Sequence, residues 1–325
     1  MGSFYRDISD IAVISAGFLL YNFIAFALQV PVGYIADRIK TGYEYFSILG
    51  CLLVAAGLIF PLFPWAKLVF CAFGNALFHV GGGIDSLVSA QGKFARSGIF
   101  ISFGAIGVAV GTVAGKSGRL PVWVVLVFLM ICVVLQMAFC RDIKRPVKAE
   151  FAFKPTVIKQ VSVVIYLSML GIVIRAVVGA YMSIPWKSTV VLAVLPGLCV
   201  FAGKFLGGFL ADRMGARKIA FISLVISAPL LAFFEGNILL CCIGLLIFNM
   251  STAMTLCVIV SMMPHNPGLG FGLTTLALCV GTAFSFFIPI PPQIRPYLII
   301  LFIFVSAVLM LFILPGKAPA GTHRC

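Results

Sequence analysis

Charge is scarce in this chain of 325 residues, and negative charge is scarcest. Asp and Glu together number 9, and charged residues make up 10% of the sequence, whereas hydrophobic residues make up 62%. The mean hydropathy of +1.18 lies far outside the range of soluble domains. With so few acids, the sequence shows no paired carboxylates or metal triad that a membrane enzyme would need. We therefore expect no enzymatic activity.

Cysteine motifs are also absent, although the chain holds 10 cysteines. The cysteines fall mainly within apolar runs, with no C-x-x-C pair and no histidine at ligand spacing. In such runs cysteine behaves as a small hydrophobic residue. The sequence therefore predicts no metal, redox centre or other cofactor, and leaves coupling to protons open.

Apolar runs fill most of the chain. A helix that spans a bilayer needs roughly 20 mainly apolar residues. The first run is no cleavable signal peptide, because it is long and ends in a charged turn. The sequence predicts an all-α, polytopic membrane protein with 11 transmembrane helices and no soluble catalytic domain. The runs cover residues 11–36, 45–63, 66–90, 97–115, 121–140, 157–184, 188–211, 218–234, 238–263, 269–289 and 294–314.

The net charge of +14 would suggest a nucleic-acid partner if it were evenly spread, but it is not. One set of alternate loops and the C-terminal tail carry Arg38, Lys40, Lys93, Arg96, Arg141, Lys144, Arg145, Lys148, Lys154, Lys159, Arg213, Arg217, Lys218, Lys317 and Arg324. The opposite loops carry only Arg6, Lys67, Lys116, Arg119, Lys187 and Arg295. By the positive-inside rule, the richer side and the C-terminus are cytoplasmic and the N-terminus lies outside. The partners expected are the bilayer and a small solute, without nucleic acid.

Two polar turns between apolar runs share one pattern. The second turn has Gly208, Asp212, Arg213, Arg217 and Lys218, and the first has Gly33, Asp37 and Arg38. The step along the chain from Asp37 to Asp212 equals the step from Arg38 to Arg213, and we call this step the repeat offset. Such an internal repeat is typical of transporters built from two similar membrane halves.

The same offset shows that the two halves are unequal. The apolar run 157–184 precedes the second half's motif helix, and its counterpart would fall ahead of the start of the chain. We therefore expect the first half to lack its first helix. The predicted organisation is a five-helix bundle at 1–140, a cytoplasmic linker at 141–156 and a six-helix bundle at 157–325.

The pattern G-x-x-x-D-R-x-G-x-[RK]-[RK] at 208–218 resembles the loop signature of the major facilitator superfamily of secondary transporters. The resemblance covers the chain from family helix two to helix twelve, and the stretches 17–29 and 77–79 look most like fosmidomycin-resistance-type efflux carriers. It implies two bundles around a midplane site lined by family helices one, four, seven and ten. The last three correspond to the segments that hold Asp85, Arg175 and Asn249.

Ionisable residues inside apolar runs are costly and mark candidate sites. Arg175 lies more than two helical turns from either end of its run. It is either a site for the substrate anion or a counter-charge, or else a structural partner of a carboxylate. Asp85 is the acidic residue that lies well inside an apolar run. We interpret it as a protonatable coupling group or as the partner of Arg175.

A polar stripe adds further candidates. Asn75, His79, Gly82, Ser86 and Ser89 follow one another at spacings of 4, 3, 4 and 3, which is one face of a helix. A stripe of this kind typically lines a water-filled cavity, and His79 titrates near neutral pH unless it is structural. Shifted by the repeat offset, Asn249 falls one residue from Asn75, which indicates a cavity shared between the halves.

Two further features have mainly structural interpretations. Lys204 precedes Asp212 by eight residues, roughly 12 Å along a helix, so its stem can reach toward the cytoplasm. Gly104, Gly107 and Gly111 lie on one helix face and favour close contact with another helix.

The sequence thus predicts a secondary transporter that exports or exchanges a small organic solute across the bacterial inner membrane by alternating access. In this interpretation Asp37 and Asp212 cap neighbouring helix N-termini, and Arg38 and Arg213 hold the loops to a facing bundle. A complete chain is expected to be monomeric. The alternative is a truncated, non-transporting remnant or a subunit that needs another chain, and we expect this form alone to transport poorly.

Overall fold

The computed structural model describes residues 11–39, 42–60, 63–118, 120–140, 148–149, 151, 158 and 160–315. Every regular element in these residues is helical. The elements are α2 (Ile11–Asn22), η1 (Phe23–Ala27), α3 (Gln29–Ile39), α4 (Tyr43–Ile59), α5 (Pro64–Val88), α6 (Phe94–Ser117), α7 (Val122–Cys140), α8 (Val161–Tyr181), α9 (Val190–Met214), α10 (Ala216–Phe233), α11 (Ile238–Asn249), α12 (Thr252–Met262), α13 (Pro267–Phe287) and α14 (Arg295–Ile313).

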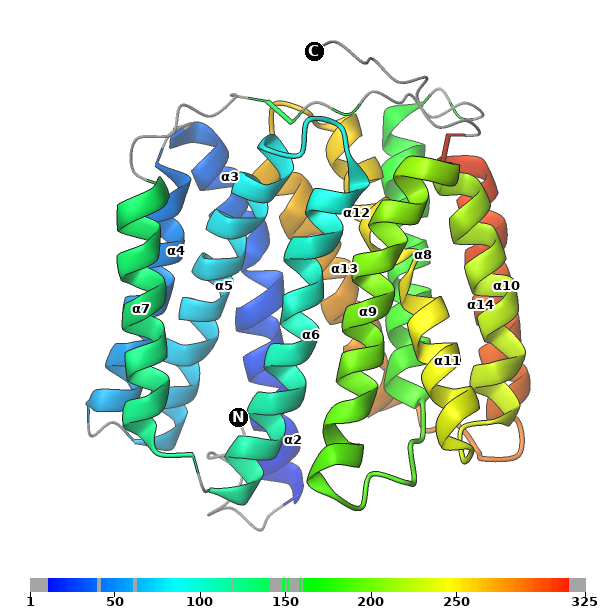
Figure 1. Cartoon of the computed structure of the whole chain (residues 1–325), viewed down its shortest axis with the longest axis horizontal. Helices are drawn as coiled ribbons and strands as arrows, with labels where there is room; N and C mark the ends of the chain where they lie inside the picture. Colours follow the sequence, from blue (N-terminus) through cyan, green and yellow to red (C-terminus); the bar gives the residue numbers. More distant parts are fainter. Residues whose placement is uncertain are drawn as a thin grey trace.

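The helices form long apolar rods that stand side by side (Figure 1). Ten rods in the described residues are long and apolar enough to cross a membrane, and two of them are continuous runs, Ala12–Ile39 and Ile238–Met262. The eleventh predicted segment is α4, an apolar helix of 17 residues. It ends earlier than predicted, because Pro64 already occupies the first turn of α5, where proline is well tolerated.

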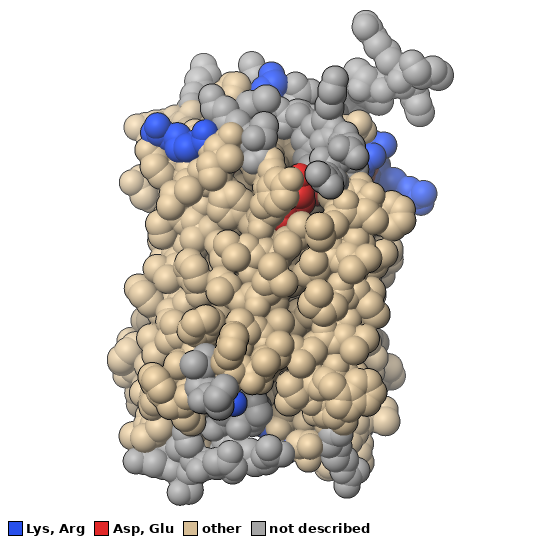
Figure 2. Space-filling model, turned by 90° about the vertical axis from the view of Figure 1, so that its left-hand side faces the viewer, with Lys and Arg blue, Asp and Glu red and all other residues tan. Residues whose placement is uncertain are grey.

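The outer surface of the rods is apolar. Val108 is 70% exposed, Phe128 64% and Phe139 71%, which would be an aggregation-prone patch in water. The side of the molecule seen in Figure 2 carries its charged side chains near the two ends and shows none across the broad middle. This is the surface that a bilayer requires, so the polytopic all-α architecture is confirmed.

The rods before residue 140 meet those after residue 160 mainly along two helix pairs, α3 with α13 and α6 with α9, and α13 also contacts α5. A Cβ atom built on Gly33 of α3 would lie 2.2 Å from the Gly268 oxygen of α13. One built on Gly208 of α9 would lie 2.8 Å from the Ala95 Cα of α6. Glycine is needed at both points because the backbones touch. The polar turns of the sequence repeat therefore lie beside close backbone contacts between the halves.

A buried cluster joins the halves at the end that carries these turns, which we call the latch end (uppermost in Figure 1). Val32 of α3 and Leu87 of α5 belong to the same core as Leu256 and Val260 of α12. The molecule is therefore closed at the latch end.

One face of α6 is uncovered in the described residues. A Cβ atom at Gly104, Gly107 or Gly111 would meet nothing within 4 Å. The predicted close contact of this glycine face is therefore wrong for the described part of the chain. Instead, α6 packs on α9 through its neighbouring face, where Ala109 lies against Gly197. The predicted linker at 141–156 lies largely outside the described residues, so the division into bundles stays a prediction.

Candidate functional site

Asp212 caps α6, a helix of the other half. Its Oδ1 accepts from the backbone N–H of Phe94 at 2.8 Å, and its Oδ2 accepts from that of Ala95 at 3.0 Å. The first N–H groups of a helix have no partner within the helix and carry its positive dipole end. A carboxylate at this place satisfies both, so Asp212 joins α9 to the start of α6.

Asp37 of the first half caps α13, a helix of the second half, in the same way. Its two carboxylate oxygens accept from the N–H groups of Gly268 and Leu269, at the start of α13, both at 2.8 Å. The step from Phe94 to Gly268 is one position shorter than the repeat offset that relates the two aspartates. The predicted capping contacts are confirmed. Each half thus holds the other by one aspartate, and we call the two contacts the reciprocal caps.

The motif arginines do not share the contacts of the aspartates. Arg38 stacks over the ring of Tyr34 on its own helix, 4.7 Å from the ring centroid, and donates to its hydroxyl. Arg213 is exposed. In the described part of the chain neither arginine forms a hydrogen bond or ion pair with the facing bundle, so their role in holding the loops stays a prediction. Arg217 donates to the Leu314 carbonyl at 2.8 and 2.6 Å, which fastens α10 to the end of α14.

Arg175 is buried and bonded within the second half. Its guanidinium donates to Ser251 Oγ at 3.0 Å and to Thr255 Oγ1 at 2.7 Å, and it lies 3.9 Å from Met310 Sδ. Ser251 sits in the break between α11 and α12. Arg175 therefore binds α8 to the irregular turn between α11 and α12, within the continuous run Ile238–Met262.

The predicted pairing of Asp85 with Arg175 is wrong. The face of α8 that bears Arg175 lies between Gly171, which contacts α14, and Ile172, which packs with Ile259 of α12. That face looks into the second half, whereas Asp85 is on α5 in the first half, near its latch end. The rotation of α8 about its own axis therefore directs Arg175 away from Asp85.

His79 points to the middle of the molecule. Gly82 lies against the ring of Phe100 on α6, and Gly83 against that of Phe271 on α13. The side chain of His79 leaves α5 between these two positions. Its Nδ1 lies 2.9 Å from the carbonyl oxygen of Asn75, on the same polar stripe. The stripe therefore faces the region where α6 and α13 approach α5, as a cavity lining requires.

Asn249 lies against α9. Its side chain donates to the Leu245 carbonyl at 2.8 Å, and its Cβ is 3.0 Å from a Cβ built on Gly203. Asn249 is therefore next to the α9 turn that holds Lys204.

Lys204 is a further candidate, which the sequence analysis had given a structural interpretation. It leaves α9 between Gly208, which contacts α6, and Gly207, which contacts the residue after α11. In the described part of the chain its ammonium has no hydrogen bond or ion pair. The signal for it was present in the repeat, because the residue one repeat offset earlier is another polar one, Gln29. The structure thus brings His79, Lys204 and Asn249 toward one central region and leaves Arg175 outside it.

Metal chemistry finds no support in the described residues, which contain no group of three or more His, Cys, Asp and Glu side chains able to hold an ion. The nine described cysteines are free thiols. No element of the site therefore points to a resident metal.

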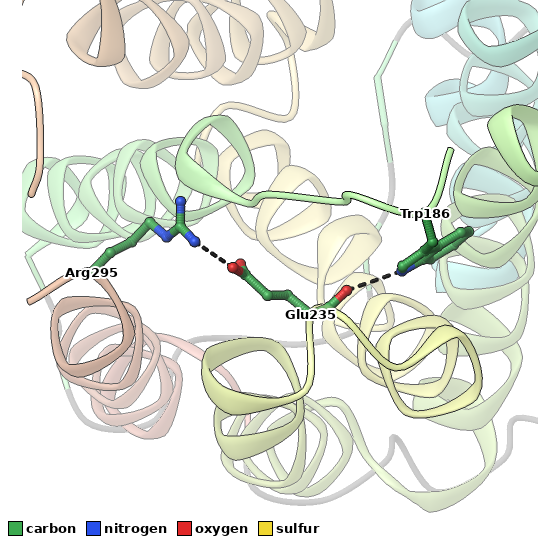
Figure 3. Close-up of polar contacts among 3 residues, drawn as sticks. All are labelled: Trp186, Glu235 and Arg295. Atoms are coloured by element: carbon green, nitrogen blue, oxygen red, sulfur yellow. Dashed lines mark hydrogen bonds and ion pairs between the residues drawn. The ribbon is translucent and has the colours of Figure 1, made fainter. Parts of the chain in front are cut away.

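At the end opposite the latch end, a polar cluster of Trp186, Glu235 and Arg295 links connections between helices of the second half (Figure 3). Arg295 forms an ion pair with Glu235, and the indole N–H of Trp186 donates to the Glu235 carbonyl at 3.0 Å. Both charged side chains are 23% exposed, so solvent screens the pair and its contribution is about 1 kcal/mol at most. The cluster joins three connections of the second half and lies away from the central region.

Comparisons with solved structures identify the fold of the chain. No protein-family model and no curated protein sequence matches the chain. A variant of the E. coli fucose:proton symporter FucP superposes with a TM-score of 0.66 at 15% identity, covering 93% of this chain and 91% of that one. FucP in the outward conformation, described as a major facilitator superfamily transporter, gives 0.64 at 14% identity, covering 94% and 90%. Neither supports the fosmidomycin-resistance subgroup. With helices, repeat and reciprocal caps in agreement, the chain has the fold of the major facilitator superfamily transporters.

Proposed function

We propose that this chain is a secondary active transporter that moves a small organic solute across a membrane by alternating access. The observation that carries the proposal is the pair of reciprocal caps, Asp37 on α13 and Asp212 on α6. A membrane scaffold that keeps one conformation does not require two equivalent hydrogen-bonded contacts between its halves at the same end. A transporter that alternates between two states needs them.

The packing beneath the caps supports this mechanism. The halves touch at the latch end through glycine backbones, at Gly33 with Gly268 and at Gly208 with Ala95. Contacts without interlocking side chains separate and re-form without large rotamer changes. Breaking each cap costs a charge-assisted hydrogen-bond pair, of order 1.5–3 kcal/mol per bond, which is a suitable barrier for a gate.

The central residues are proposed to handle the solute. His79, Asn75 and Asn249 lie on faces directed to the region between the halves, and we propose that they line the path. Asp85 is proposed as the proton-coupling carboxylate on the same helix. Arg175 is proposed to hold the turn between α11 and α12, because its guanidinium donates to Ser251 there.

Coupling, direction and location belong to the proposal. One fold neighbour is a proton symporter by name, which favours proton coupling. The resemblance of residues 17–29 to efflux carriers favours export, which with proton coupling means exchange of solute for proton. The basic loops favour a cytoplasmic latch end in a bacterial inner membrane.

A second candidate is favoured by the uncovered glycine face of α6. A chain that works with a helix from another polypeptide would present such a face. In that case this chain is a subunit and does not transport by itself.

The test uses purified protein in proteoliposomes loaded with a mixture of small metabolites. A pH gradient is imposed and the solutes that leave or enter are identified by mass spectrometry. We expect at least one solute to move faster than through empty vesicles, and the Asp37→Asn, Asp212→Asn double variant to abolish the difference. Folded protein that moves no solute would reject the first candidate and favour the second.

A further inference from the structure

Gln29 and Lys204 occupy equivalent positions in the two halves, because the repeat offset separates them. The carbonyl oxygen of Gln29 is 2.6 Å from a Cβ built on Gly272 of α13, and that of Lys204 is 2.9 Å from a Cβ built on Gly98 of α6. The step from Gly98 to Gly272 is one position shorter than the repeat offset. The two polar residues therefore stand at matching points of the two contacts between the halves.

The side chain of Gln29 is buried with one atom unsatisfied. Gln29 is 0% exposed, and its Nε2 donates to the carbonyl of Ala25 on its own helix. Its Oε1 is buried and accepts no hydrogen bond in the described part of the chain. A buried acceptor without a donor is costly and calls for an explanation.

The direction of Gln29 follows from its neighbours on α3. Gly33, four residues on, contacts α13, and Val32, three residues on, belongs to the core shared with α5. Residues three and four positions apart stack on one face of a helix. Gln29 therefore leaves α3 between α13 and α5, toward the same central region as His79.

Lys204 lies on α9 as Gln29 lies on α3, but its side chain is charged. Gly208, four residues on, contacts α6, and Gly207, three residues on, contacts Met250 just after α11. Its ammonium is unpaired in the described part of the chain, and an ammonium inside a membrane protein is rare without a partner. The central region thus contains an unpaired cation on one side and an unpaired acceptor on the other.

We propose that Lys204 and Gln29 are the two recognition points of the central site, and that the solute is a small organic anion that also carries a hydroxyl or N–H donor. Lys204 binds the anionic group, and Gln29 Oε1 accepts from the donor. This inference rests on the proposed transport function and specifies its substrate class. It assigns the lysine to the solute rather than to the membrane surface.

The test measures binding to the purified, folded protein with three probes. Gluconate has the charge and the hydroxyls, hexanoate has the charge alone, and fucose has hydroxyls alone. We expect gluconate to bind and to raise the midpoint of thermal unfolding, and the other two to bind more weakly. Loss of one charge-assisted hydrogen bond predicts that Lys204→Met weakens gluconate binding about tenfold or more.

Further variants separate recognition from structure. Gln29→Leu should weaken gluconate binding and leave hexanoate binding unchanged, whereas Lys204→Arg should retain binding of both anions. Lys218→Met removes an exposed lysine at the latch end and is the matched control, with unchanged affinity expected. If Lys204→Met does not fold, Lys204→Gln and the Gln29→Leu comparison carry the test.

The outcomes distinguish this inference from the proposed function. No gluconate binding, fucose binding as tight as gluconate, or full gluconate affinity in the folded lysine variant would each overturn the anionic class. Movement of a neutral solute in the vesicle experiment would then leave transport standing. Gluconate binding that depends on Lys204, without any flux, would support the site and reject transport.

Discussion

Gly281 packs directly against Val173: a Cβ atom on Gly281 would lie 2.5 Å from the Val173 carbonyl oxygen and 2.6 Å from the Ala176 Cβ. Helices α13 and α8 thus touch backbone to backbone. Gly107 is the equivalent glycine of the first half, since Gly107 and Gly281 are as far apart in the chain as Gly98 and Gly272. A Cβ on Gly107 would meet nothing within 4 Å. Among the described residues, the repeat therefore contains one covered and one uncovered copy of the same surface.

Substitution of the two glycines should have opposite results. Gly281→Leu forces a side chain into the α8 backbone and should destabilise the protein by about 1–3 kcal/mol or more. Gly107→Leu enters open space and should change stability by less than about 0.5 kcal/mol. Thermal unfolding in detergent measures both. Equal destabilisation by Gly107→Leu would mean that another helix covers that face of α6.

The reciprocal caps should be visible in backbone protection. Asp212→Asn removes the charge that holds the start of α6, so exchange of the Phe94 and Ala95 amide hydrogens should accelerate about tenfold or more. The amides of Gly268 and Leu269, which Asp37 holds, serve as the internal control. Hydrogen exchange followed by mass spectrometry measures the protection of these amides. Unchanged protection at the start of α6 would show that the cap contributes little to the stability of that helix end.

Transport offers a separate measure of the same substitution. We expect Asp212→Asn to reduce flux more than it reduces the amount of protein in the membrane, because the charge acts on the latch equilibrium. Flux is compared at matched abundance. Full flux at equal abundance would assign the motif a purely structural role.

Removal of the buried guanidinium should leave the fold intact. Arg175→Met fills similar space, and Ser251 and Thr255 keep their bonds to the Phe248 and Thr252 carbonyls. Because a buried charge without a carboxylate is costly, the free energy of unfolding should change by less than about 1 kcal/mol. Thermal unfolding measures the change, and Arg213→Met at an exposed position is the control. A much larger loss of stability in Arg175→Met than in the control would show that the fold depends on Arg175.

Topology can be tested without knowledge of the solute. The basic loops predict that reporter fusions after Lys148 and at Cys325 both read cytoplasmic. An external signal at the C-terminus would reverse the orientation of the latch end.

Some of the site followed from sequence pattern alone. The Asp-Arg turns and their common offset predicted that Asp37 and Asp212 cap helices, since a carboxylate beside a helix start has one obvious partner. The stripe through Asn75 and His79 was likewise visible as a helical spacing. In contrast, the sequence left two interpretations of Arg175 open, and the structure excludes only its pairing with Asp85. The interpretation of Lys204 as a residue that reaches the membrane surface stays a prediction.

By itself, the sequence determined the apolar spans, their order, the repeat and the two capping aspartates, because length, hydropathy and spacing are local properties of the chain. Only the tertiary structure decided which face of each span meets which neighbour. Lipid and helix interior are equally apolar, so a membrane helix carries little pattern that distinguishes its two sides. The rotation of α8 turned Arg175 into the second half, and that of α9 turned Lys204 to the centre, and both depend on glycine contacts that exist only when the helices are packed.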